Sequence, residues 1–168
     1  MRWLLFVASL ASCRTNIDDP VTGPDASTMM TRNCTVSTSS ACKEAETHSD
    51  FTWLNTNVFN SNCSGTSCHQ LSSNSNAKKN PYGDLATTYG SLVNFESQVN
   101  PGVKLVVAGK VDQSYLMVML HDFDPAKFSP PQGAVPSDPG YMPQNSPSIC
   151  CQKIDAIQRW IEAGAPMQ

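Results

Sequence analysis

The sequence predicts an all-α domain over residues 50–168. Apolar residues recur at helical spacing in several segments of this region, and residues suited to helix caps precede those segments. No alternating run is long enough to build a sheet. A chain of 168 residues has the length of about one domain. The expected architecture is therefore about four helices, with a long proline-rich loop before the last one.

The first two predicted helices have clear starting points. Asp50 can cap the first helix, and Phe51, Leu54 and Val58 then share one face. A polar stretch broken by proline and glycine follows this helix. Asp84 can cap the second helix, which also has an apolar face.

The third predicted helix follows a short extended run at residues 104–109. Asp112 can cap this helix, which is apolar on one side and ends at Asp124-Pro125. Seven of the 12 prolines then lie in residues 125–147. A loop of this length inside a compact domain is usually functional or disordered.

The final helix has the clearest pattern. Ser146 can cap it, and Pro147 suits its first turn. Its apolar face repeats at helical spacing, and Asp155 and Arg159 form an i, i+4 pair on the polar face. Gly164 is expected to end the helix.

The composition limits the possible partners. Charged residues make up only 15% of the chain, the net charge is −3, and basic residues do not cluster. Phosphate binding needs clustered Lys and Arg, so we expect no nucleic-acid partner. The sequence also lacks a nucleophile elbow, a zinc-protease motif and a phosphate-binding glycine loop, which argues against ordinary hydrolase chemistry.

The N-terminus has the features of an export signal. An apolar run of eight residues follows Met1-Arg2, and Leu10-Ala11-Ser12-Cys13 resembles a bacterial lipobox. This predicts a signal peptide at residues 1–12 and a lipid anchor on Cys13; an ordinary cleaved signal is the alternative. The Ser/Thr-rich residues 13–49 are expected to form a disordered tether. The protein would then lie in a bacterial cell envelope, anchored by lipid outside the cytoplasm.

Residues 62–69, with the sequence NCSGTSCH, are the most informative stretch. Cys63 and Cys68 can add to the vinyl groups of haem, and the adjacent His69 can bind the iron. Four residues separate the cysteines here, instead of the usual two. A structural Cys63–Cys68 disulfide is the alternative, and a zinc site is weaker because a second ligand pair is missing.

Further motifs follow this stretch in order: Ser114-Tyr115-Leu116, Tyr141-Met142-Pro143 and residues 157–165, with the sequence IQRWIEAGA. With Cys68-His69, they resemble small monohaem cytochrome c domains of secreted bacterial lipoproteins, including a variant whose cysteines are four apart. The resemblance spans residues 51–166. Ala108 departs from it, because the family usually has proline there.

The resemblance implies a haem c with axial iron ligands from His69 and Met142. It also implies one-electron transfer to redox proteins of the cell envelope, not enzyme activity. Rival distal ligands are His121, Met117 and Met119, whereas His48 is a poor candidate. The aromatic residues expected to pack on the haem are Trp160, Phe59, Tyr89 and Tyr115.

The seven cysteines divide into three groups. Cys13 takes the lipid, and Cys63 and Cys68 take the haem. The remaining four can form two disulfides: Cys34, Cys42, Cys150 and Cys151. Cys150 and Cys151 are neighbours, so separate bridges to Cys34 and Cys42 are expected, although four cysteines allow three pairings.

Two other functions remain open. One is a haem-free lipoprotein, stapled by disulfides, that acts as a binding or structural module. The other is a haem enzyme such as a peroxidase, which would need an open distal position on the iron.

Overall fold

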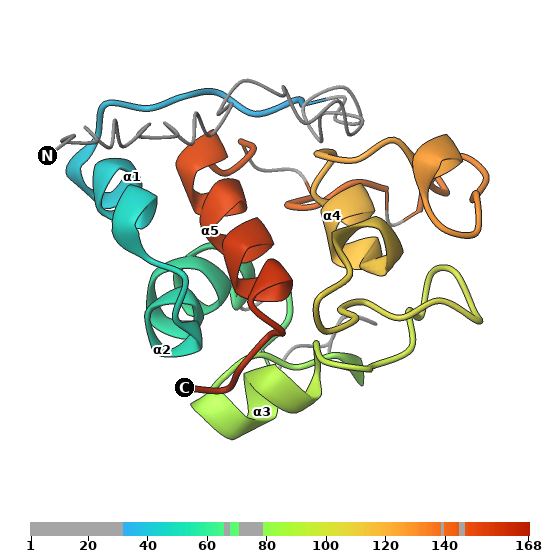
Figure 1. Cartoon of the computed structure of the whole chain (residues 1–168), viewed down its shortest axis with the longest axis horizontal. Helices are drawn as coiled ribbons and strands as arrows, with labels where there is room; N and C mark the ends of the chain where they lie inside the picture. Colours follow the sequence, from blue (N-terminus) through green and yellow to red (C-terminus); the bar gives the residue numbers. More distant parts are fainter. Residues whose placement is uncertain (1–31, 66–67, 71–78, 139, 145–146) are drawn as a thin grey trace, which may run out of the picture.

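The computed structural model describes residues 32–65, 68–70, 79–138, 140–144 and 147–168. Within them the chain is helical, with isolated β-bridges and no strands. In chain order the elements are α1 (Ser40–Glu44), η2 (Ala45–Thr47), α2 (Phe51–Leu54), the π-helix η3 (Asn55–Cys63), α3 (Leu85–Gly90), η5 (Val111–Gln113), α4 (Tyr115–Met119), η6 (Pro125–Lys127) and α5 (Cys151–Glu162). Helix α5 runs through the middle, between α1 and α2 on one side and α4 on the other (Figure 1). The predicted all-α class is confirmed for the described residues.

Two predicted caps are confirmed. The Asp50 carboxylate accepts a hydrogen bond from the backbone N–H of Trp53 at 2.8 Å and starts α2. Asp84 accepts from the N–H of Thr87 at 2.8 Å and starts α3. Each cap satisfies an otherwise orphaned backbone donor at the start of its helix.

The core forms where α2 and η3 meet α5. Phe51, Leu54 and Val58, the predicted apolar face, are fully buried. The Phe51 ring stacks on Trp160 of α5, with 4.9 Å between ring centroids. The indole Nε1 of Trp160 donates to the carbonyl of Pro166 at 2.7 Å, so the chain after α5 folds back against the core.

Helix α4 begins later than the sequence predicted. Asp112 does not cap it, because this residue lies inside η5. Ser114 directly precedes α4, but its hydroxyl donates to the carbonyl of Lys110 at 2.7 Å and accepts from the N–H of Val107 at 2.9 Å. The extended run 104–109 pairs only through isolated bridges, such as Val93 with Val106.

Helix α5 also begins later than predicted. Its N-cap is Cys150 and its first residue is Cys151, so the start expected at Ser146-Pro147 is wrong. Pro147 is exposed and non-helical, and Ser146 itself lies outside the described residues.

Asp155 and Arg159 of α5 do not form the predicted pair with each other. Asp155 pairs with Arg32, whereas Arg159 donates to backbone carbonyls of Ala45 and His48. The backbone of Gly164, with φ +93°, ends the helix as predicted.

Residues 32–49 are folded onto the domain, which corrects the prediction of a disordered tether for this part of the chain. Cys34 is bonded to Cys151 and Cys42 to Cys150, so the predicted disulfides are present and bridge separate partners. Ala45 of the same segment is fully buried. Each bond closes a loop of more than 100 residues, which contributes on the order of 4–5 kcal/mol in the chain-entropy account.

The predicted signal peptide, Cys13 and the first part of the tether lie outside the described residues. Among the helices of the described part, none has the length and apolar character needed to cross a bilayer.

Candidate functional site

The cysteine-histidine motif begins at the end of η3, where Cys63 is the last residue. The backbone N–H of Cys68 donates to the carbonyl of Gly65 at 2.8 Å, and the N–H of His69 donates to the carbonyl of Cys63 at 3.1 Å. These two bonds connect the residues on either side of the motif's centre. Cys63 and His69 therefore lie close together in spite of the long spacing.

The orientation of His69 is fixed by two contacts. Its Nδ1 lies 2.8 Å from the carbonyl oxygen of Asn80, and its ring stacks on Tyr82 with 4.5 Å between centroids. A carbonyl can only accept, so Nδ1 is the donor and Nε2 carries the lone pair of the neutral ring. Hydrogen bonds of this kind orient metal-binding histidines and raise the basicity of the ligating nitrogen.

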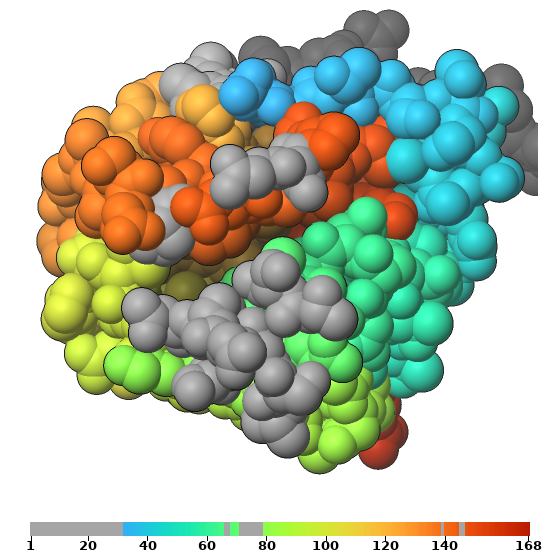
Figure 2. All heavy atoms as spheres, turned by 180° about the vertical axis from the view of Figure 1, so that it is seen from behind, coloured from blue at the N-terminus to red at the C-terminus, as the bar shows by residue number. Residues whose placement is uncertain are grey.

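A cleft opens beside this turn. It contains about 490 Å³ of empty space, a volume that includes solvent at its open mouth. Figure 2 shows this face of the molecule hollowed between the orange segment before α5 and the green segment below it. The lining side chains come from η3, the motif, α4, α5 and the proline-rich loop: Val58, Phe59, Asn62, Cys63, Cys68, His69, Tyr82, Leu116, Leu120, Met142, Pro143, Ile149 and Ile157.

Met142 enters the cleft from the proline-rich loop. Its backbone N–H donates to the carbonyl of Met119, the last residue of α4, at 2.7 Å. The preceding side chain, Tyr141, stacks on His121 with 3.9 Å between centroids. The loop that carries Met142 is therefore attached to the end of α4 at two points.

The predicted rivals of Met142 lie elsewhere. Met117 and Met119 are buried in the core, and neither lines the cleft. His121 stacks on Tyr141, and His48 hydrogen-bonds Asp50 and stacks on Trp53.

Of the four aromatic residues predicted to pack on a haem, only Phe59 lines the cleft. Trp160 and Tyr89 pack around Phe51, and Tyr115 packs on Phe128. Tyr82, which was not predicted, is the second aromatic side chain that lines the cleft. It was missed because its contact with His69 joins segments that no local pattern connects.

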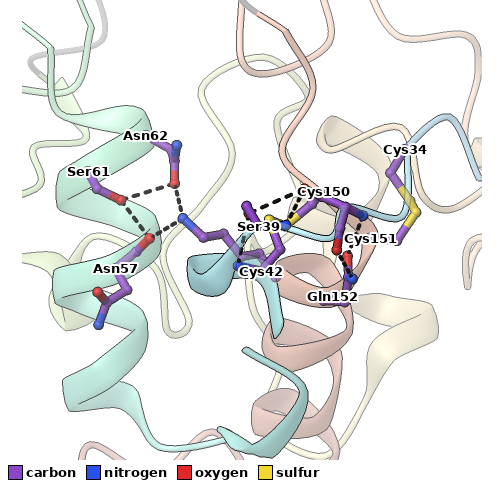
Figure 3. The surroundings of a disulfide bond; sticks show 11 residues. Cys34, Ser39, Cys42, Asn57, Ser61, Asn62, Cys150, Cys151 and Gln152 are labelled. Carbon is purple, nitrogen blue, oxygen red and sulfur yellow. Dashed lines mark hydrogen bonds between the residues drawn. A yellow bond between two sulfur atoms is a disulfide. The ribbon is translucent and has the colours of Figure 1, made fainter. Parts of the chain in front are cut away.

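A buried lysine ties α5 to the end of η3. The Nζ of Lys153 donates to the carbonyl of Asn57 at 2.6 Å and to Oδ1 of Asn62 at 2.9 Å (Figure 3). Burial lowers the pKa of Lys153, although the neighbouring Cys63 opposes this shift. The contact positions the residues directly before Cys63. Sequence reasoning missed it because a lysine on an amphipathic helix is normally assigned to the solvent face.

The groups that line the cleft fit a covalently attached haem. Two thiols can form thioethers, an imidazole and a thioether sulfur can bind iron, and the surrounding walls are mostly apolar. Among the described residues, no three His, Cys, Asp or Glu side chains are grouped so that they could hold a metal ion.

No family model matches the chain, and comparisons with curated proteins and with solved structures give no significant match either. The function is therefore argued from the site.

Proposed function

We propose that residues 50–168 form a c-type cytochrome domain that carries single electrons. The observation that carries this proposal is that Cys63, Cys68, His69 and Met142 all line one cleft. The first three lie within one short motif, but Met142 follows His69 by 73 residues, so its presence in the same cleft is a property of the fold.

Each residue has a defined part in this function. Cys63 and Cys68 would hold the haem through thioether bonds, and His69 and Met142 would bind its iron. The haem contributes an iron that changes oxidation state by one electron. The carbonyl of Asn80 accepts a hydrogen bond from Nδ1 and orients the His69 ring, and Nε2 is the nitrogen that would bind the iron.

The apolar walls tune the site. Leu116, Leu120 and Ile157 give the cleft an apolar lining, which lowers the local dielectric around the site. A His/Met ligand pair raises the reduction potential above that of a His/His pair. Two protein ligands on the iron suit an electron carrier, because electron transfer does not require either ligand to dissociate from the iron. We infer that Cys13 anchors the domain to a membrane of a bacterial cell envelope, where it meets other redox proteins.

The alternative is a haem-free, disulfide-stapled lipoprotein. That reading predicted a third disulfide between Cys63 and Cys68. Both residues line the cleft, where the haem proposal uses their thiols for thioether bonds.

Expression in a bacterium with a cytochrome c maturation system tests the proposal. We expect haem to stay with the chain after denaturation, and the reduced pyridine haemochrome spectrum to show thioether linkage. Replacing Cys63 and Cys68 by alanine removes the bound haem, whereas replacing Cys42 and Cys150 by serine leaves it. A natural chain that carries no covalent haem in this host would refute the proposal.

A further inference from the structure

The strap, residues 32–37, connects the two ends of the loop that carries Met142. This distal loop leaves α4 at His121 and Asp122 and reaches α5 at Cys150. The light-blue strap crosses above α5 in Figure 1. Its contacts with the two ends differ in chemistry, and each can be removed separately.

At the end of α4 the strap makes polar contacts. The backbone N–H of Asn33 donates to the carbonyl of His121 at 3.2 Å, and its side-chain Nδ2 lies 2.9 Å from Nδ1 of His121. The Arg32 guanidinium donates through Nε to the buried carboxylate of Asp122 at 2.9 Å. His121 also stacks on Tyr141, so two contacts lead from Asn33 to the residue before Met142.

At the start of α5 the strap is bonded covalently. Cys34 forms a disulfide with Cys151, and the N–H of Cys151 donates to the carbonyl of Thr35 at 3.2 Å. The Gln152 side chain accepts from the N–H of Ser37 at 3.2 Å and donates to its carbonyl at 2.7 Å. Figure 3 shows the disulfide and Gln152 at this end of α5.

A loop whose ends are held at a fixed separation has fewer conformations than a loop with independent ends. We propose that the strap is a positioning element for Met142: by joining the end of α4 to the start of α5, it holds the distal loop so that the thioether stays in the cleft. The inference rests on the proposed function only where it treats Met142 as an iron ligand. This proposal gives a role to residues 32–37, which were predicted from the sequence to belong to a disordered tether.

The test is a double-mutant cycle in the full-length protein. Asn33→Ala removes the side-chain contact of the strap with His121 at the end of α4, and the pair Cys34→Ser/Cys151→Ser removes its covalent bond to α5. Arg32, which pairs with both Asp122 and Asp155, is left unchanged. One readout is hydrogen exchange at the Met142 amide, which donates to Met119. The other, in the haem-loaded protein, is the charge-transfer band of ferric iron bound to a thioether.

Removing contacts at either end of the strap should loosen the same loop. Each variant should therefore accelerate exchange at Met142 by about tenfold, and the combined variant by clearly less than the product of the two single effects. The thioether band should weaken in the same non-additive way. Independent, additive effects on Met142 exchange would overturn the proposal.

The second disulfide supplies a matched control. The pair Cys42→Ser/Cys150→Ser opens a loop of 108 residues instead of 117, so the loss of global stability should be similar. This pair leaves the strap attached at both ends, so exchange at Met142 should stay near the wild-type rate. Equal acceleration by both disulfide variants would also overturn the proposal. Hydrogen exchange at Met142 can be measured in the haem-free protein. The positioning role of the strap can therefore be refuted or supported independently of whether the protein binds haem.

Discussion

Cys63 and Cys68 line the same cleft, but Cys63 is partly buried at the end of η3 whereas Cys68 is exposed. Burial raises the pKa of the Cys63 thiol to about 12, with a further contribution from the neighbouring Cys68. The two positions therefore differ in reactivity before any haem is attached.

This difference predicts an order of alkylation. In the haem-free protein at pH 8, iodoacetamide should modify Cys68 more than about tenfold faster than Cys63, because the thiolate is the reacting form. Mass spectrometry of tryptic peptides measures both rates. In denaturant the two rates should converge, and equal rates in the folded protein would contradict the burial of Cys63.

His69→Ala should remove the proximal imidazole without preventing thioether formation. We expect haem to remain covalently bound and the low-spin spectrum to become high-spin, with recovery when free imidazole is added. Absorption spectra of the ferric and ferrous forms measure the change. His48→Ala is the matched control, because His48 stacks on Trp53 away from the cleft. A low-spin spectrum that survives in His69→Ala would assign the ligand to another residue.

Met142→Ala should lower the reduction potential, because a thioether stabilises the reduced iron. We expect a decrease on the order of 0.1 V, within the range of about 0.8 V over which axial ligands set haem potentials. Potentiometric titration checks this. Met167→Ala serves as the control, since Met167 is an exposed methionine near the C-terminus. Equal potentials in the Met142 variant and the wild type would exclude Met142 as a ligand.

Asp50 should make helix α2 sensitive to acid. Partial burial acts to raise its pKa, but hydrogen bonds from His48 and the Trp53 N–H outweigh it and leave the pKa below the ordinary value of 3.8. A lowered folded-state pKa stabilises the protein above the unfolded-state pKa, and this contribution is lost as the pH falls through the folded-state pKa.

Asp50→Ala should therefore destabilise the protein by about 1 kcal/mol at pH 7, and the difference from the wild type should shrink below about pH 4. Urea unfolding at several pH values measures it. Asp50→Asn is the conservative control, because asparagine caps helices well but does not ionise in this range. A loss that is the same at pH 3 and pH 7 would show that the charge of Asp50 does not contribute.

The parts of the fold that sequence reasoning predicted correctly depend on neighbours in the chain. The buried face of Phe51, Leu54 and Val58 follows from helical periodicity, and the caps at Asp50 and Asp84 follow from local hydrogen bonding. The predicted starts of α4 and α5 were wrong because each had several plausible capping residues nearby. Local chemistry could not choose among them.

The parts that were missed depend on distant contacts. Tyr82 meets His69 across a long polar segment, and Lys153 reaches the carbonyl of Asn57 from another helix. Residues 32–49 have the composition of a disordered tether, but the two disulfides hold them against α5. Asp155 could pair locally with Arg159, yet it pairs with Arg32 after the strap docks. Composition and spacing contain no signal for such partners.

The adjacent cysteines at the start of α5 impose an order of assembly. Each disulfide joins a residue of the segment 32–49 to one made more than 100 positions later. Neither cross-link can form until residues 150 and 151 have been synthesised, whereas the cysteine-histidine motif is complete some 80 residues earlier. A growing chain thus presents Cys63, Cys68 and His69 while α5 is still missing, and covalent closure of the domain has to follow the synthesis of the cysteine-histidine motif.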